Sequence, residues 1–217
     1  MIYDSIGREA ANPEKYIREL FAYQCMPTLL KLKPASLITV DKRRLPDNQE
    51  LYSLLRTYLE RYSCSFIPFQ ETESRLYLFL YSEHLLWQSM TTGLRQPFLE
   101  RFGYPVRKDQ LGAALSQLGR SYRNYWLSGE FPHEIGIFLG YPLADVEGFI
   151  QNSGRNYILC GMWKVYQRVK VAEAAFYCFH QVKARAVELS TRKNELLHPD
   201  KEEMQMFRYN LWELLSY

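Results

Sequence analysis

The segment of residues 131–151, FPHEIGIFLGYPLADVEGFIQ, most restricts the folds that this chain can adopt. It places three glycines and two prolines among apolar residues that have helical spacing. A glycine inside a helix costs about 1 kcal/mol relative to alanine, so helix stability does not explain Gly136 and Gly148. Both glycines would instead allow a close approach, either of a packed neighbour or of a ligand.

The same segment divides into two short helices. Gly140 is suited to the left-handed residue that ends a helix, and Pro142 is suited to the first position of the next one. The apolar residues on each side supply one continuous buried face per helix. We therefore predict helices over residues 132–139 and 142–151, joined by a tight turn.

Two short helices around a glycine-containing turn also resemble a DNA-binding helix-turn-helix. The second helix carries Asp145 and Glu147, which we expect on its outward face, and no Lys or Arg occurs between them and Arg155. DNA phosphates would repel such a helix, and the net charge of the whole chain is only +3. We therefore do not favour nucleic acid as a partner and keep DNA binding as an alternative.

Strand and helix patterns along the rest of the chain predict an α+β fold. Three strand patterns in the first 85 residues indicate a small mixed β-sheet in the N-terminal part, and the C-terminal part is largely helical. We predict a single α+β domain over residues 1–217, with residues 190–217 as a helical C-terminal extension. The expected strands are 36–40, 65–69, 75–81 and 157–166, and further expected helices are 83–91, 95–102, 108–126 and 169–189.

The first helix has a clear start and an interruption. Asn12 and Pro13 are typical of an N-cap and a first helical residue. Pro27 clashes with the preceding turn, so we predict that this helix kinks or ends near Cys25. Asp47 is predicted to cap the next helix.

The composition favours a cytoplasmic protein without a membrane segment. No signal-peptide pattern is visible, and the longest apolar run, Leu76–Tyr81, is far shorter than a membrane span. The four cysteines are widely separated and contain no CxxC pair, which favours reduced thiols over a disulfide framework. The 17 tyrosines suit either a tyrosine-rich core or the walls of a wet ligand site.

His133 and Glu134 follow Pro132 and would lie in the first turn of a helix. The positive end of the helix disfavours a protonated imidazole, so we expect a lowered pKa for His133. A neutral imidazole can act as a base or a metal ligand, or it can simply hydrogen-bond at the helix start. The pair is not the HExxH motif of zinc proteases, because Ile137 occupies the place of the second histidine.

Two cysteines are candidates for chemistry. Cys25 precedes the proline interruption, and Cys160 lies in the predicted strand 157–166. Strand alternation would place Cys160 on the same face as Lys164, and a lysine near a thiol lowers the thiol pKa and makes it more reactive. Alternatively, both cysteines are small buried hydrophobic residues. The sequence motifs of serine hydrolases and of common nucleotide binders are absent.

Several motifs along the chain belong together. They are Cys25-x-Pro27-Thr28-Leu29, Lys33-Pro34-Ala35-Ser36-Leu37, residues 133–142 (HEIGIFLGYP), Asp145-Val146, Gly148-Phe149-Ile150, Gly154, Asn156 and Gly161-x-Trp163-Lys164-Val165-Tyr166. This set resembles a bacterial family, domain of unknown function 3793, which is found mainly in Firmicutes. The resemblance covers roughly residues 13–185, and it departs from the family at Met26, at Lys31-Leu32 and in the tail.

The resemblance implies no activity, but it joins several reactive residues into one motif set and thereby favours a shared pocket. We expect a protein that binds a small ligand, a metal or a cofactor of unassigned identity in a Cys/His/Lys-lined pocket; whether it is an enzyme stays open. A non-catalytic protein-interaction or regulatory module is the alternative. Candidate catalytic residues are Cys25, His133, Glu134, Cys160 and Lys164; candidate metal ligands are Cys25, His133 and Cys160; candidate ligand-binding residues are Lys33, Tyr141 and Trp163.

Overall fold

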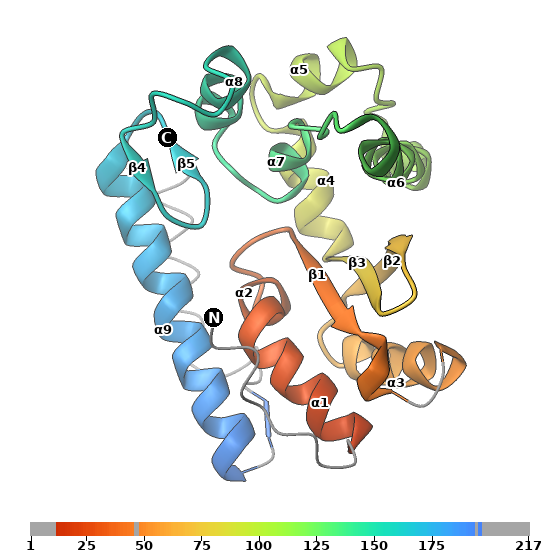
Figure 1. Cartoon of the computed structure of the whole chain (residues 1–217). Coiled ribbons are helices and arrows are strands. Elements are labelled where there is room, and N and C mark those ends of the chain that lie inside the picture. Colours follow the sequence, from red (N-terminus) through yellow and green to blue (C-terminus); the bar gives the residue numbers. More distant parts are fainter. Residues whose placement is uncertain (1–11, 46–47, 194, 197–217) are drawn as a thin grey trace.

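A three-stranded sheet with helices on both faces organises the protein (Figure 1). The computed structural model describes residues 12–45, 48–193 and 195–196, and the statements below refer to these residues. The predicted α+β class, with a sheet in the N-terminal part and a largely helical C-terminal part, is confirmed. The strands are β1 (Ala35–Asp41), β2 (Ser65–Glu71) and β3 (Arg75–Tyr81), in the order β1-β3-β2.

Both pairings in this sheet are antiparallel, although we expected a mixed sheet. Helix α3 (Asn48–Glu60) follows β1 and returns the chain to the end of the sheet at which β1 began. Strands β1 and β2 therefore run in the same direction. The hairpin between β2 and β3 then places β3 between them. The two strands that point the same way are therefore not neighbours. The expected cap at Asp47 lies outside the described residues.

Strand β3 separates two hydrophobic cores because its side chains alternate between the two faces of the sheet. The first core receives Leu76, Leu78 and Leu80, and the second receives Tyr77, Phe79 and Tyr81. In the second core Phe79 stacks on Phe69 of β2, with ring centroids 4.9 Å apart. Both faces of the sheet are thus apolar, and each is covered by helices.

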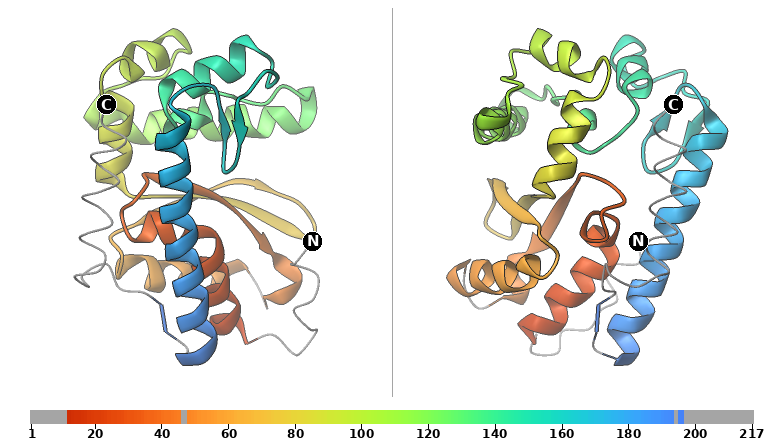
Figure 2. Two further views of the ribbon diagram at one scale, coloured as in Figure 1. Left: turned by 90° about the vertical axis from the view of Figure 1, so that its left-hand side faces the viewer. Right: turned by 180° about the vertical axis from the view of Figure 1, so that it is seen from behind.

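The first core is enclosed by the N-terminal helices, α3 and the long helix α9 (Val169–Lys193), which runs alongside α1 and α2 (Figure 2). Asn12 caps the first helix as predicted, since its Oδ1 accepts a hydrogen bond from the Lys15 backbone at 3.1 Å. The interruption predicted near Cys25 is a π-helical turn. This wider turn accommodates Pro27, which lacks an N–H, without ending the helical segment. The consecutive elements are α1 (Pro13–Leu20), η2 (Phe21–Cys25) and α2 (Met26–Leu29).

The second core lies on the aromatic face of the sheet, beneath the helices of residues 83–151. Helix α4 has the predicted bounds, whereas α7 begins at Ile135 instead of residue 132, because His133 and Glu134 form a turn. The helical elements of this region are α4 (Glu83–Thr91), α5 (Arg95–Arg101), η4 (Lys108–Gln110), α6 (Leu111–Ser128), α7 (Ile135–Phe138) and α8 (Leu143–Gln151). A further 3-10 turn, η3 (Lys42–Arg44), follows β1.

Gly136 and Gly148 are packing positions. A Cβ atom on Gly136 would lie 2.7 Å from Cγ2 of Val146, and one on Gly148 would lie 2.6 Å from Cγ of Tyr166. Real Cβ atoms do not approach neighbours so closely, so any larger residue would force α7, α8 and the following loop apart. Of the two reasons considered for these glycines, close packing accounts for both.

Residues 157–166 form a tight hairpin instead of the single strand we predicted. Its strands are β4 (Leu159–Cys160) and β5 (Lys164–Val165), and Cys160 pairs with Lys164 across them. The turn lies directly on α9, because Gly161 has no side chain: a Cβ there would be 2.2 Å from Cε2 of Phe176. Figure 1 shows the hairpin beside the first turns of α9.

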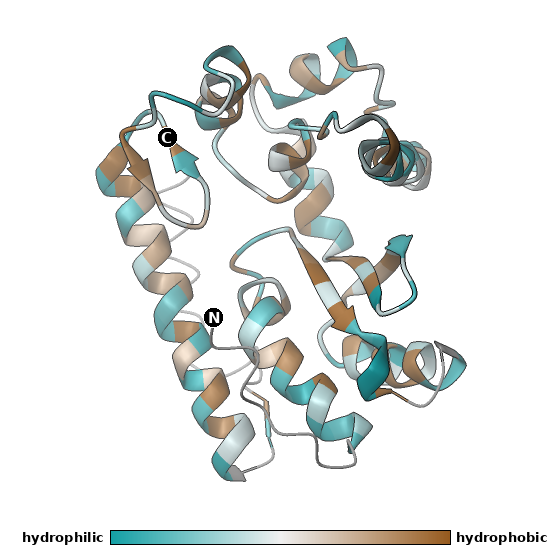
Figure 3. Ribbon diagram, viewed as in Figure 1, coloured by the Kyte–Doolittle hydropathy of each residue, from teal (hydrophilic) through white to brown (hydrophobic). Residues whose placement is uncertain are grey.

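Helix α9 extends four residues beyond the predicted end at residue 189. Apolar and polar residues alternate along it (Figure 3), as expected for a helix with one face in the core. It contains the first residues of the predicted extension 190–217, and residues 197–217 lie outside the described part of the chain. None of the described helices combines the length and the apolar character needed to cross a membrane.

Candidate functional site

A cavity of about 740 Å³ lies between the first residues of β1, the α7–α8 turn, the β4–β5 hairpin and α9. Its walls also include η2, the loop at residues 31–34 and α4. Segments far apart in the sequence therefore converge on it, and they surround the middle of the molecule in Figure 1. A pocket of this size can accommodate a small organic molecule.

The π-helical turn presents Tyr23 and Gln24 to the cavity. Gln24 is anchored to β1 because its Oε1 accepts from the Thr39 backbone N–H at 3.1 Å and its Nε2 donates to the Thr39 carbonyl at 3.4 Å. The Gln24 side chain thus pairs with the Thr39 backbone as a neighbouring strand would, and it fixes the π-helical turn against β1. Such π-helical turns occur frequently at functional sites.

Lys33 lies in a loop that is held from both sides. On one side, the hydroxyl groups of Thr28 and Ser36 share a buried hydrogen bond of 2.8 Å. On the other, Gly140 lies directly against Pro34. Lys33 lines the cavity, and its Nζ lies 5.8 Å from the centre of the Tyr141 ring. The half-buried side chain is thus directed to the cavity by the loop.

Among the described residues, four cationic side chains line this cavity: Lys31, Lys33, Arg95 and Lys183. Burial and the nearby Lys183 ammonium lower the pKa of Lys33 to about 8, against a smaller opposing effect of the Cys25 thiol. Burial also lowers the pKa of Lys183. No Asp or Glu lines the cavity, and none of the four cations forms a salt bridge within the described part of the chain.

Arg95 is oriented by groups from two segments, α4 and the α7–α8 turn. Its guanidinium donates to the Ser89 hydroxyl at 2.8 Å, to the Ser89 carbonyl at 3.3 Å and to the Tyr141 carbonyl at 3.3 Å. The Ser89 hydroxyl in turn donates to the Ile137 carbonyl at 3.1 Å. A guanidinium group has five N–H donors. The three hydrogen bonds to Ser89 and Tyr141 therefore leave two donors that no described residue accepts from, and a ligand can use them.

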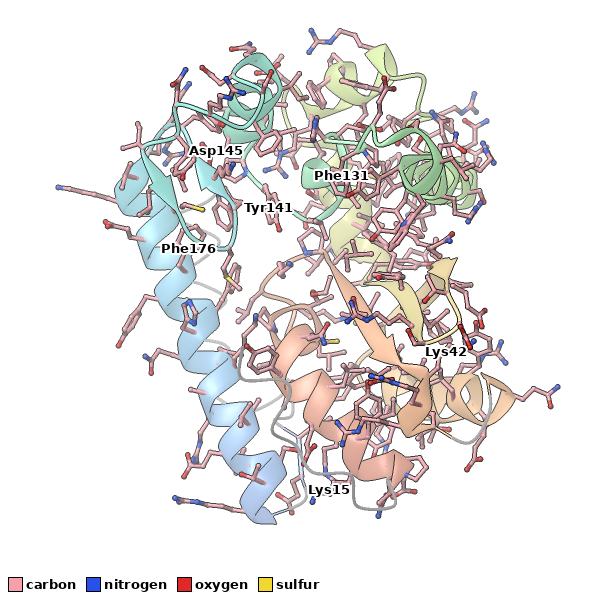
Figure 4. All side chains as sticks on the ribbon, viewed as in Figure 1. Lys15, Lys42, Phe131, Tyr141, Asp145 and Phe176 are labelled. Atoms are coloured by element: carbon pink, nitrogen blue, oxygen red, sulfur yellow. The ribbon has the colours of Figure 1, made fainter. Side chains whose placement is uncertain are left out.

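Aromatic side chains form another wall of the cavity (Figure 4). Tyr141 stacks on Trp163, with ring centroids 5.0 Å apart and planes 25° apart. Trp163 also contacts Phe176 edge to face, at 4.4 Å between centroids. A stacked pair of this kind offers an apolar surface to the planar part of a ligand.

Asp145 holds the aromatic wall in place, and our expectation that it faces outward was wrong. Its side chain is buried, and one carboxylate oxygen accepts from Trp163 Nε1 at 2.8 Å. The other oxygen accepts from the backbone N–H groups of Tyr166 and Gln167, at 2.8 and 3.1 Å. Asp145 therefore ties the start of α8 to the hairpin and fixes the Trp163 ring.

The two candidate cysteines lie in different surroundings. Cys25 is buried in the first core, where burial raises its thiol pKa, so it is the small hydrophobic residue of our alternative interpretation. Cys160 is exposed on the hairpin. Lys164, opposite Cys160, donates to the Gly154 carbonyl at 2.7 Å, and its Nζ lies 4.9 Å from the centre of the Tyr157 ring.

His133 and Glu134 lie on the turn before α7 and do not line the cavity. The His133 ring packs on Phe149, at 4.8 Å between ring centroids, and partial burial lowers its pKa. The direction is the one we predicted, but the cause is burial, since the helix starts only at Ile135. Glu134 is buried and accepts a hydrogen bond of 2.8 Å from the Tyr104 hydroxyl, whose pKa is raised by burial.

The structure brings together only part of the predicted site. Lys33, Tyr141 and Trp163 line one cavity, whereas Cys25, His133, Glu134, Cys160 and Lys164 do not. Within the described ranges, no group of three or more His, Cys, Asp or Glu residues could hold a metal ion, so Cys25, His133 and Cys160 do not form a metal site there.

Three cations of this cavity, Lys31, Arg95 and Lys183, were not predicted as site residues from the sequence. Lys183 follows Phe179 by four residues and therefore shares its helix face, which is a signal that could have been used. Arg95 follows Thr92-Gly93-Leu94, and nothing in this stretch distinguishes it from a surface residue.

Comparison with known proteins gives one match. A family model described as "Protein of unknown function (DUF3793)" matches residues 21–198. No curated protein and no solved structure matches the chain.

Proposed function

The chain belongs to the protein family of unknown function DUF3793, and we propose that it binds a small organic anion in the cavity between the sheet, the hairpin and α9. The observation that carries this proposal is the charge of the lining. Four cationic side chains line the cavity, and no acidic side chain of the described residues accompanies them. Grouped cations are destabilised by burial, and an anionic ligand would offset that cost.

The type of cation supports a carboxylate or phosphate group in the ligand. Arg95 is held by Ser89 and Tyr141 so that its remaining N–H donors are preorganised. Guanidinium recognises carboxylate and phosphate oxygens with paired hydrogen bonds, whereas lysine acts as a mobile point charge. We therefore assign anion orientation to Arg95, and charge neutralisation to Lys33 and Lys183.

The aromatic wall supports an apolar or planar part in the same ligand. Tyr141 and Trp163 form one stacked surface, and Phe179 and Met162 also line the cavity. Pockets for small ligands typically combine such apolar walls with a few polar groups that fix orientation. The ligand class is thus a small organic molecule with an anionic group at one end.

A matched pair of fluorescent probes tests this proposal. Anilinonaphthalene sulfonate carries an anionic group on an aromatic system, and N-phenylnaphthylamine has the same ring system without the charge. We expect the sulfonate to bind as one molecule per chain and the neutral probe to bind at least about tenfold more weakly, which corresponds to about 1.4 kcal/mol. Fluorescence titration measures both affinities.

Charge-removing variants locate this binding in the cavity. Lys183→Gln is expected to weaken binding of the sulfonate by roughly ten- to hundredfold, because a hydrogen bond to a charged group contributes about 1.5–3 kcal/mol. Lys170→Gln is the control, since Lys170 is exposed near the start of the same helix and does not line the cavity. Equal affinities in the two variants, or equal binding of the two probes, would contradict the proposal.

The pH dependence of binding gives a further prediction. Lys33 has a pKa of about 8 in the free protein, so it loses its charge as the pH rises through that value. The sulfonate stays ionised, and its dissociation constant should therefore rise by up to about tenfold per pH unit above that point. Lys33→Gln should flatten this profile, whereas Lys170→Gln should retain it. A flat profile in the unchanged protein would show that Lys33 takes no part.

A further inference from the structure

We propose that the side-chain amine of Lys33 is a nucleophile that forms an imine with a carbonyl group of the bound anion. This inference rests on the proposed function and adds a reaction class to it. The ligand would then be an aldehyde or an oxo acid that carries a carboxylate or phosphate group. The position of Lys33 in the cavity carries the proposal.

Two of the lysines that line the cavity, Lys33 and Lys183, have no hydrogen-bond or carboxylate partner within the described residues. Lys31 donates to the Ser63 carbonyl at 2.8 Å and contacts the Cys64 sulfur at 3.1 Å. Lys164 donates to the Gly154 carbonyl at 2.7 Å. A ligand in the cavity can therefore reach either nitrogen without displacing a partner. Lys33 is the one beside the Tyr141–Trp163 wall, 5.8 Å from the centre of the Tyr141 ring, whereas the Lys183 nitrogen lies 6.0 Å from the centre of the Tyr23 ring.

The surroundings of Lys33 favour a neutral amine. Tyr141 covers it on one side, and the Lys183 ammonium acts on it from α9. Burial and a neighbouring cation are the two arrangements by which proteins activate lysine as a nucleophile. With a pKa of about 8, about a tenth of Lys33 is neutral near neutral pH, compared with less than about a thousandth of an ordinary lysine.

The step is balanced without an oxidant or a reductant. The lone pair of the neutral Lys33 nitrogen attacks the carbonyl carbon, and the electron pair of the C=O π bond moves to oxygen, which takes up a proton. The carbinolamine then loses that oxygen as water, with the second proton of the nitrogen, and the C=N bond forms. Arg95 and Lys183 would hold the anionic group while the amine attacks.

Trapping with borohydride tests this step. Pyridoxal phosphate serves as the probe, because it is an aromatic aldehyde with an anionic group, and borohydride supplies the hydride that reduces an imine to a stable amine. We expect one adduct per chain at limiting probe, placed on Lys33 by peptide mass spectrometry. Pyridoxal, which lacks the phosphate, should react at least tenfold more slowly.

Two variants decide between outcomes. Lys33→Arg keeps a positive charge at this position but has no primary amine, so it should lose the adduct. Lys183→Gln removes the neighbouring cation, so the pH midpoint for modification of Lys33 should move upward. Adducts spread evenly over exposed lysines such as Lys170, or an unchanged adduct in Lys33→Arg, would overturn the inference.

The same experiments separate this inference from the proposed function. If the sulfonate binds in the cavity and Lys33 is not modified, imine formation is excluded and anion binding stands. If the sulfonate does not bind in the cavity, the proposed function fails, whatever the adduct pattern.

Discussion

Replacing Asp145 by alanine should lower the free energy of unfolding by about 3–5 kcal/mol. Asp145 is only 3% exposed, and its carboxylate accepts hydrogen bonds from Trp163 Nε1 and from the backbone N–H groups of Tyr166 and Gln167. Alanine would leave these donors without their acceptor: the Trp163 donor is buried, and the two backbone donors are partly buried. Each such buried donor costs about 1–3 kcal/mol, which sets the size of the effect.

Glu147 provides the matched control, because it lies on the same helix two residues later. Its side chain is partly exposed and pairs with Arg101 at 3.3 Å, also at the surface. A surface ion pair contributes at most about 1 kcal/mol, so Glu147→Ala should change stability little. Urea unfolding followed by circular dichroism measures both variants. Similar losses for the two would show that Asp145 does not hold the hairpin.

Replacing the Asp145 carboxylate should also change ligand binding in the cavity. Asp145→Asn keeps the shape of the side chain but turns one acceptor oxygen into an NH2 group that faces a donor. We expect a smaller loss of stability than for alanine and a weaker affinity for anilinonaphthalene sulfonate, because the Trp163 ring loses its anchor. The Asp145→Asn variant therefore reports on the wall of the site while the fold stays intact.

Local patterns predicted much of the fold. The bounds of α4 and β3 are those expected. Strand β3 alternates Leu and aromatic residues, and α4 has a polar start, so a few neighbouring residues determine each element. The hairpin at 157–166 was mistaken for one strand, because Gly161 acts through its contact with Phe176 on α9. Such a contact, between residues that no pattern connects, is invisible in the sequence.

The candidate site was predictable only in part, for the same reason. Lys33, Tyr141 and Trp163 were singled out from motifs, and the structure places them around one cavity. Asp145 looked like a surface residue because its three donors come from residues 163–167, well beyond its own helix. Arg95 likewise becomes notable only when α4 and the α7–α8 turn are placed side by side.

Replacing Gly140 by alanine should lower the free energy of unfolding by about 2–5 kcal/mol, for two separable reasons. Gly140 has a φ of +85°, which an L-amino acid adopts at a cost of about 1–2 kcal/mol. A Cβ atom at this position would also lie 2.4 Å from Cδ of Pro34. Relieving this overlap must move the α7–α8 turn or the Lys33 loop, and overpacking typically costs about 1–3 kcal/mol.

Gly129→Ala isolates the first of these two costs. Gly129 has a similar φ of +78°, but a Cβ atom there would meet nothing within 4 Å. The difference between the two variants therefore measures the contact with Pro34 alone. Because Pro34 adjoins Lys33, Gly140→Ala should also weaken binding of the sulfonate, whereas Gly129→Ala should not. Equal stability losses and unchanged binding in both variants would contradict this prediction. They would mean that the Gly140–Pro34 contact does not position Lys33.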